Sequence, residues 1–77
     1  MYHIAKSVRY YNGPPYFGAS CEKAGVPSGK TYTNILEAMD DADKLSLVNP
    51  GGFFVYDVET QKLVYGGPLA NLEQTRL

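Results

Sequence analysis

The chain has one cysteine, one histidine and no tryptophan among its 77 residues. Cys21 lacks a partner for an internal disulfide, whereas small secreted domains usually depend on several. A catalytic thiol needs a histidine and an orienting Asn or Asp, and a zinc site needs four ligands, which Cys21 and His3 cannot supply. We therefore expect no metal, no cofactor and no enzymatic activity, with Cys21 a small buried or half-buried apolar side chain.

Long apolar runs and an excess of basic charge are also absent. No stretch approaches the roughly 20 apolar residues of a membrane-spanning helix. Met1 leads into Tyr2-His3-Ile4-Ala5-Lys6 rather than into the apolar core of a signal peptide. These absences predict a cytoplasmic protein with no membrane partner. The formal net charge of −1 disfavours nucleic acid as a partner, because proteins that bind it usually carry a basic surface.

The length allows one domain with one small core. A chain of this size buries only about 60–65% of the surface that its unfolded form exposes. The apolar fraction of 44% and the charged fraction of 19% are typical of a folded chain. We expect residues 1–77 to form a single domain, with residues 68–77 as a C-terminal tail that can carry one helical turn capped by Asn71.

Two segments in the first third of the chain are predicted to be strands. Over residues 2–11, apolar and polar side chains alternate with the period of a half-buried strand, and two consecutive prolines then end the pattern. Residues 16–22 are expected to form a second strand, with Phe17 and Cys21 on one face. Residues 24–32 are expected to be a loop, because glycine and proline punctuate them.

The clearest element is a helix over residues 34–48. Asn34 followed by Glu37 fits a capping box, with Thr33 as a competing cap, and the proline at position 50 ends the helix. The predicted core stripe consists of Ile35, Ala38, Met39, Ala42 and Leu45. The opposite side is predicted to carry Glu37, Asp40, Asp41 and Lys44, with an ion pair between Asp40 and Lys44.

A hairpin follows the helix. Residues 53–58 and 62–65 are predicted to be strands joined by Glu59-Thr60-Gln61, with Gln61 where glycine would be preferred. The resulting order, β-β-α-β-β, predicts an α+β fold: a two-layer domain in which one amphipathic helix covers one face of an antiparallel sheet of three to four strands.

This architecture leaves an aromatic sheet face to be covered. Residues 53–56 are apolar on both faces, and one helix covers only one of them. The other face must be covered by a ligand, by a second chain or by the tail, which contributes Leu69, Leu72 and Leu77. We therefore expect self-association or burial against a partner, because exposed aromatic sheets favour association.

The segment from residue 24 to residue 31 matches a loose phosphate-loop pattern, with alanine in place of the first glycine. A functional phosphate loop follows a buried apolar strand, whereas here Ser20-Cys21-Glu22-Lys23 precedes it, and Pro27 removes one of the N–H groups that would hold the phosphates. This context excludes a nucleotide hydrolase. An alternative function is still open: the 26–32 loop binds a small anionic, nucleotide-like ligand at an oligomer interface. The candidate ligand-binding residues are Arg9, Tyr11, Tyr16, Ser28, Gly29, Lys30, Thr31 and Tyr32.

The near-neutral total hides an uneven distribution of charge. Residues 1–31 carry a net +3, residues 32–59 a net −5 and the remainder a net +1. The acidic residues fall largely on the outer side of the predicted helix, where Leu36, Asp40, Asp43 and Leu47 form one row. We therefore expect a non-enzymatic inhibitor or adaptor that binds a protein partner through this row or through the aromatic sheet face.

Overall fold

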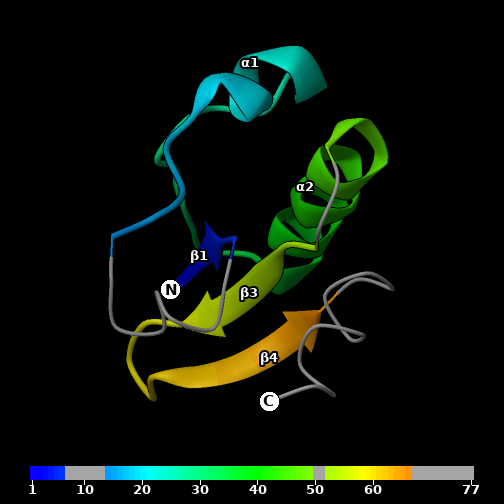
Figure 1. Cartoon of the computed structure of the whole chain (residues 1–77). Helices are drawn as coiled ribbons and strands as arrows, with labels where there is room; N and C mark the ends of the chain where they lie inside the picture. Colours follow the sequence, from blue (N-terminus) through cyan, green and yellow to red (C-terminus); the bar gives the residue numbers. More distant parts are fainter. Residues whose placement is uncertain (7–13, 50–51, 67–77) are drawn as a thin grey trace.

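The fold is an α+β domain with a four-stranded antiparallel sheet and two helices, of which one is long (Figure 1). The computed structural model describes residues 1–6, 14–49 and 52–66. Its elements are β1 (Tyr2–Ala5), α1 (Ala19–Ala24), β2 (Thr31–Tyr32), α2 (Ile35–Val48), β3 (Phe54–Asp57) and β4 (Lys62–Gly66). The predicted fold class is confirmed, whereas the order of elements differs because α1 was not predicted.

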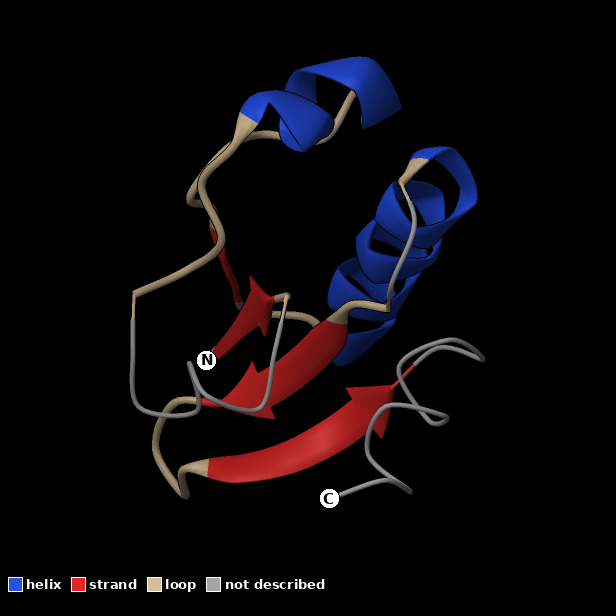
Figure 2. Ribbon diagram, in the orientation of Figure 1, coloured by secondary structure: helices blue, strands red, loops and turns tan. Residues whose placement is uncertain are grey.

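The strands are arranged in the order β2-β1-β3-β4. β1 lies inside the sheet and pairs with β3 in a register that sets His3 opposite Tyr56 and Ile4 opposite Val55. Both helices lie on one side of this sheet (Figure 2). The core between the two layers joins side chains from both helices, three strands and the connecting segments: Ile4, Cys21, Val26, Tyr32, Ala38, Ala42, Leu45, Phe53 and Val55.

The strand predicted over residues 16–22 is wrong. Residues 19–24 form α1, which ends where Gly25 adopts a left-handed conformation with φ 71°. The N–H of Gly25 then donates to the carbonyl of Glu22, and the next N–H donates to the carbonyl of Cys21. A glycine that closes a helix in this way favours helix over strand for the residues before it. Cys21 is buried, as expected.

The boundaries of two other predicted segments also change. The strand predicted over residues 2–11 is observed as β1 and ends at Ala5, and residues 7–11 lie outside the described part of the chain. Its polar side is not exposed, because His3 and Ala5 are buried. The loop predicted over residues 24–32 contains β2, which pairs with β1 at the sheet edge. The tail at residues 68–77 lies outside the described residues.

The predicted helix is confirmed as α2. Asn34 is its cap, since the Asn34 side chain accepts a 2.8 Å hydrogen bond from the N–H of Leu36. Glu37 does not complete a capping box and instead pairs with Lys30. The core stripe is buried at Ala38, Ala42 and Leu45 and half-buried at Ile35 and Met39.

The predicted position of Asp41 is wrong. This carboxylate is buried and accepts a 2.6 Å hydrogen bond from the hydroxyl of Tyr32. The predicted ion pair between Asp40 and Lys44 is replaced by one between Lys44 and Asp41, whose charged atoms lie 3.6 Å apart. Asp41 lies at the edge of the core stripe. Its side chain turns inward because Tyr32 of β2 offers it a hydrogen-bond donor there.

The predicted hairpin is confirmed with small shifts of its ends. β3 and β4 are joined by residues 58–61, and Gln61 has a φ of 57° in the region that glycine prefers. The side chain of Asp57 stabilises the turn, because its Oδ1 accepts a 2.9 Å hydrogen bond from the N–H of Glu59. The pairing of β3 with β4 shifts register between Val55 and Tyr56.

The second sheet face is not an uncovered aromatic surface. Ala5, Phe54 and Tyr56 form a separate buried cluster with Leu63 packed against it. Phe54 and Tyr56 have no exposed surface within the single chain. The burial of these two side chains therefore needs neither a second chain nor a ligand, and self-association stays a prediction.

Candidate functional site

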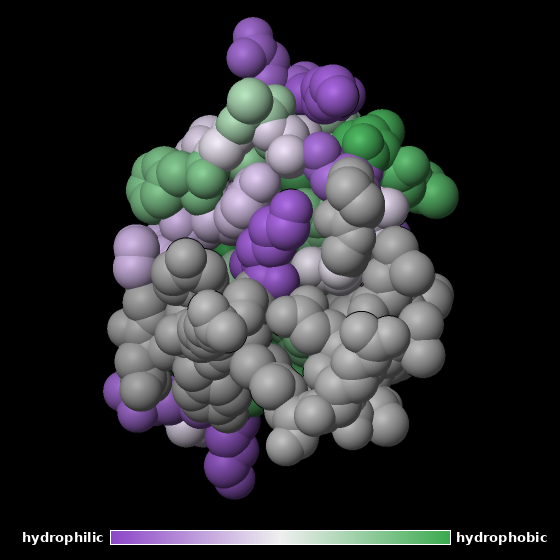
Figure 3. All heavy atoms as spheres, in the orientation of Figure 1, coloured by the Kyte–Doolittle hydropathy of each residue, from purple (hydrophilic) through white to green (hydrophobic). Residues whose placement is uncertain are grey.

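The row predicted on α2 is exposed along its whole length. Leu36 is 66% exposed and Leu47 is 85% exposed, and Asp40 and Asp43 lie exposed between them. Residues spaced by four, three and four positions share one side of a helix. We call these four side chains the α2 strip. Figure 3 shows apolar groups beside strongly hydrophilic ones on the part of the surface that belongs to the helices.

One acidic residue of the α2 strip is fixed by the sheet. The hydroxyl of Tyr65 in β4 donates a 2.7 Å hydrogen bond to Asp43 Oδ1. This hydrogen bond, with burial as a smaller cause, raises the pKa of Tyr65 to about 12. Tyr65 therefore stays protonated at neutral pH and holds the Asp43 carboxylate in place while it remains exposed.

The unneutralised charge of α2 is concentrated on the α2 strip. Two of the four acidic side chains of the helix have a basic partner, because Glu37 pairs with Lys30 and Asp41 with Lys44. The ion pairs among the described residues include neither Asp40 nor Asp43. The last turn of the helix holds no basic residue. A partner that meets the α2 strip therefore meets two uncompensated negative charges.

The predicted ligand-binding residues come together only in part. The loop and the segment before α1 meet where the N–H of Gly29 donates a 2.9 Å hydrogen bond to the carbonyl of Tyr16. Ser28 and Thr31 are exposed. Arg9 and Tyr11 lie outside the described residues.

Two of the predicted ligand-binding residues are already engaged. The Lys30 ammonium pairs with Glu37 and lies 4.7 Å from the centroid of the Tyr32 ring. Tyr32 is 2% exposed, so its ring is not open to a ligand. The residue is buried because its ring packs in the core and its hydroxyl reaches Asp41.

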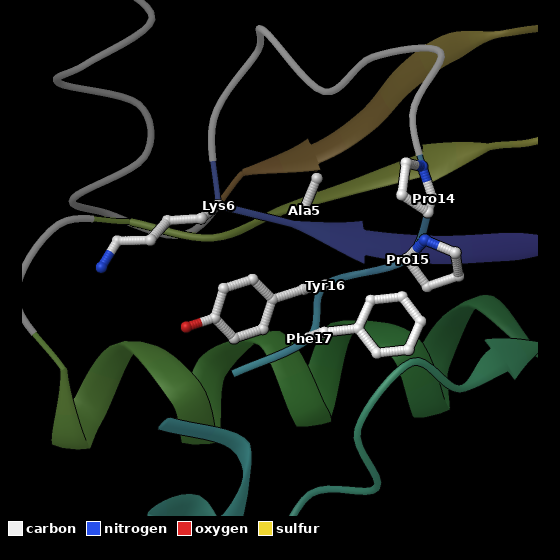
Figure 4. A pocket seen from close by; sticks show the side chains of 6 residues that line it. All are labelled: Ala5, Lys6, Pro14, Pro15, Tyr16 and Phe17. Atoms are coloured by element: carbon white, nitrogen blue, oxygen red, sulfur yellow. The ribbon is translucent and has the colours of Figure 1, made fainter. Parts of the chain in front are cut away.

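A pocket beside this loop was not predicted from the sequence. Its volume is about 280 Å³, and it is lined by Ala5, Lys6, Pro14, Pro15, Tyr16 and Phe17 (Figure 4). The run of four ring-bearing residues from Pro14 to Phe17 was a signal for it, but the pocket also needs the end of β1 as a wall. That contact joins two separate segments, and the spacing of residues in the sequence does not reveal it.

The remaining reactive side chains are shielded. Burial raises the pKa of the Cys21 thiol, which disfavours the nucleophilic thiolate. His3 is buried, and its Nε2 has no hydrogen-bond partner among the described residues. In the same part of the chain, no three His, Cys, Asp or Glu side chains are placed to hold a metal ion. No helix there has the length and apolar character needed to cross a membrane.

Comparison with known proteins gives no match to a family model, to a curated protein or to a solved structure. Any function proposed for this chain therefore depends on its own residues and their geometry.

Proposed function

We propose that this protein is a non-enzymatic inhibitor or adaptor that binds a basic partner protein through the α2 strip. The observation that carries the proposal is the exposure of Leu36 and Leu47 on either side of the uncompensated Asp40 and Asp43. A cytoplasmic location belongs to the same proposal and is supported by the single buried Cys21, which forms no internal disulfide.

The two kinds of side chain contribute different parts of the binding energy. Full burial of an exposed leucine side chain contributes about 1.5–3 kcal/mol, and Leu47 is almost entirely open to solvent. The two carboxylates attract a basic partner, raise the rate of encounter and fix its register. The partner that fits has an apolar contact for each leucine and Lys or Arg side chains between them.

The contacts favour the α2 strip over the anionic-ligand alternative. A phosphate at the 26–32 loop would have to compete with Glu37 for Lys30, and the ring of Tyr32 is not accessible. At the α2 strip, no ion pair within the described part of the chain has to break before a partner binds. Ligand binding by the loop stays a prediction, which a rise in melting temperature with millimolar nucleotide would support.

The proposed function is tested by capture of partners with the purified chain, identification by mass spectrometry and titration of each purified candidate at several salt concentrations. The doubly substituted variant Asp40→Lys/Asp43→Lys is expected to weaken binding by about tenfold or more, since close charge pairs across an interface contribute at least about 1.5 kcal/mol. Leu47→Ser is expected to weaken binding without changing its salt dependence.

Two control variants distinguish binding through the α2 strip from two other effects. These are the effect of acidic charge elsewhere on the surface and the effect of the hydrogen bond that Asp43 accepts. Glu22→Lys reverses an exposed acidic residue on α1 and should leave binding unchanged. Tyr65→Phe removes the hydroxyl that holds Asp43 and retains the charge. The proposal is wrong if the partner binds the charge-reversed variant and the Leu47→Ser variant as tightly as it binds the unaltered protein.

A further inference from the structure

The pocket beside β1 has two chemically different ends. In Figure 4 the rings of Pro14, Pro15 and Phe17 lie toward one end, and the Lys6 ammonium and the Tyr16 hydroxyl point toward the other. The methyl group of Ala5 lies between the ends. A molecule that fills the pocket therefore contacts apolar rings along its body and a cation with a hydrogen-bonding hydroxyl at its tip.

The Lys6 ammonium has a ring contact and, among the described residues, no counter-ion. It lies 5.6 Å from the centroid of the Phe53 ring, within the range of a cation–π contact. The ion pairs among the described residues are those of Met1 with Glu59, Lys30 with Glu37 and Lys44 with Asp41, and none of them uses Lys6. The positive end of the pocket is thus available to an anionic group.

The apolar wall is fixed by the backbone. The N–H of Tyr16 donates a 2.6 Å hydrogen bond to the carbonyl of Ile4, and the Tyr16 ring packs edge-on against Phe53. Phe17 is 62% exposed, yet its ring lies so close to Gly29 that a Cβ there would overlap it. A wall held from both sides loses little conformational entropy when a ligand binds.

We propose that this pocket binds a small molecule with a flat apolar body of one or two rings and a carboxylate. The volume of about 280 Å³ is close to the lower limit of small-molecule sites, about 300 Å³, which limits the ligand to this size. The carboxylate pairs with Lys6 and accepts from the Tyr16 hydroxyl, and the ring system packs against the two prolines and Phe17. This site shares no residue with the α2 strip, so a test of ligand binding here is independent of the test of the proposed protein partner.

The experiment titrates the full chain with 2-naphthoate and with the uncharged 2-naphthalenemethanol, each followed by amide chemical shifts. We expect both probes to shift the amides of Lys6, Tyr16 and Phe17, with the carboxylate bound at least about fivefold more tightly, as charge-assisted hydrogen bonds are stronger than neutral ones. Lys6→Gln should remove this preference and leave binding of the alcohol unchanged. Lys62→Gln, at an exposed lysine of β4, is the matched control and should retain the preference.

A second variant tests the apolar end. Phe17→Ala should weaken both probes by a similar factor, and its thermal unfolding transition shows whether the variant is folded. The proposal is overturned if neither probe binds, if the two probes bind the unaltered protein equally, or if Lys6→Gln and Lys62→Gln behave alike. Shifts confined to residues away from the pocket would overturn it as well.

Discussion

The hydroxyl of Tyr32 donates a 2.6 Å hydrogen bond to the carboxylate of Asp41 between β2 and α2. Both side chains are buried, and the Lys44 ammonium 3.6 Å from Asp41 supplies the opposite charge. Burial, and then the hydrogen bond to Asp41, raises the pKa of Tyr32, so the hydroxyl remains a donor at neutral pH. Because β2 has only two residues, this contact fastens a short edge strand to the helix.

Removal of the Tyr32 hydroxyl is expected to destabilise the protein markedly, although the substitution deletes only one oxygen atom. Tyr32→Phe leaves the Asp41 carboxylate buried without its donor and should lower the free energy of unfolding by about 1–3 kcal/mol. Denaturation by urea measures the difference. Tyr65→Phe, which removes the hydroxyl that donates to the exposed Asp43, is the matched control and should cost less, about 0.5–1 kcal/mol. Equal losses for the two variants would contradict a special role for the buried pair.

His3 is expected to make stability depend on pH in mildly acidic solution. Burial lowers the pKa of His3, whereas in the unfolded chain it keeps its ordinary value of 6.5. The unfolded state therefore binds a proton first, so this contribution to stability is complete above about pH 6.5 and decreases as the pH falls toward the lowered pKa. Measurements between about pH 7.5 and 5.5 keep the carboxylates ionised.

The variant His3→Phe tests this assignment. It retains an aromatic ring against Tyr56, which His3 contacts edge-on at 5.8 Å, and it removes both the titration and the unpartnered Nε2. We expect the free energy of unfolding to become nearly independent of pH in this range and to rise at neutral pH by about 1 kcal/mol, the lower end of the cost of an unsatisfied buried polar atom. An unchanged pH dependence would assign the titration to another group.

Gly25 and Gly29 form a natural pair for separating backbone strain from steric overlap. Both have positive φ, 71° and 68°. A Cβ at Gly25 would meet nothing within 4 Å, whereas one at Gly29 would overlap the Phe17 ring. Gly25→Ala should cost about 1 kcal/mol from the left-handed conformation alone, and Gly29→Ala should cost more. Addition of Phe17→Ala to Gly29→Ala should remove the excess, and thermal unfolding of the three variants checks this order.

The sequence predicted the long helix and the hairpin because the signals for both are local. Asn34 lies at a cap position, the apolar residues of α2 recur at helical spacing, and Gln61 occupies the turn position that requires a positive φ. Helical spacing also predicted that Leu36 and Leu47 share the exposed side of α2, and this is confirmed.

One failure is local, and the other two concern contacts between different segments of the chain. Residues 19–24 are too few for a reliable period, and the apolar residues Ala19 and Cys21 fit a strand as well as a helix. Asp41 lies inward because Tyr32 of β2 meets it, and the pocket exists because Lys6 lies beside the segment of Tyr16. None of these contacts follows from the spacing of residues within one element.

The position of β1 inside the sheet has a consequence for the order of folding. β3 and β4 are joined by a short turn and can pair early, whereas the pairing of His3 with Tyr56 must close a loop of about 50 residues. During synthesis β1 is made long before β3. The edge of β1 that pairs with β3 therefore has no partner strand until most of the chain has been made. The sheet is therefore completed late, and we expect the docking of β1 onto the hairpin to limit the folding rate.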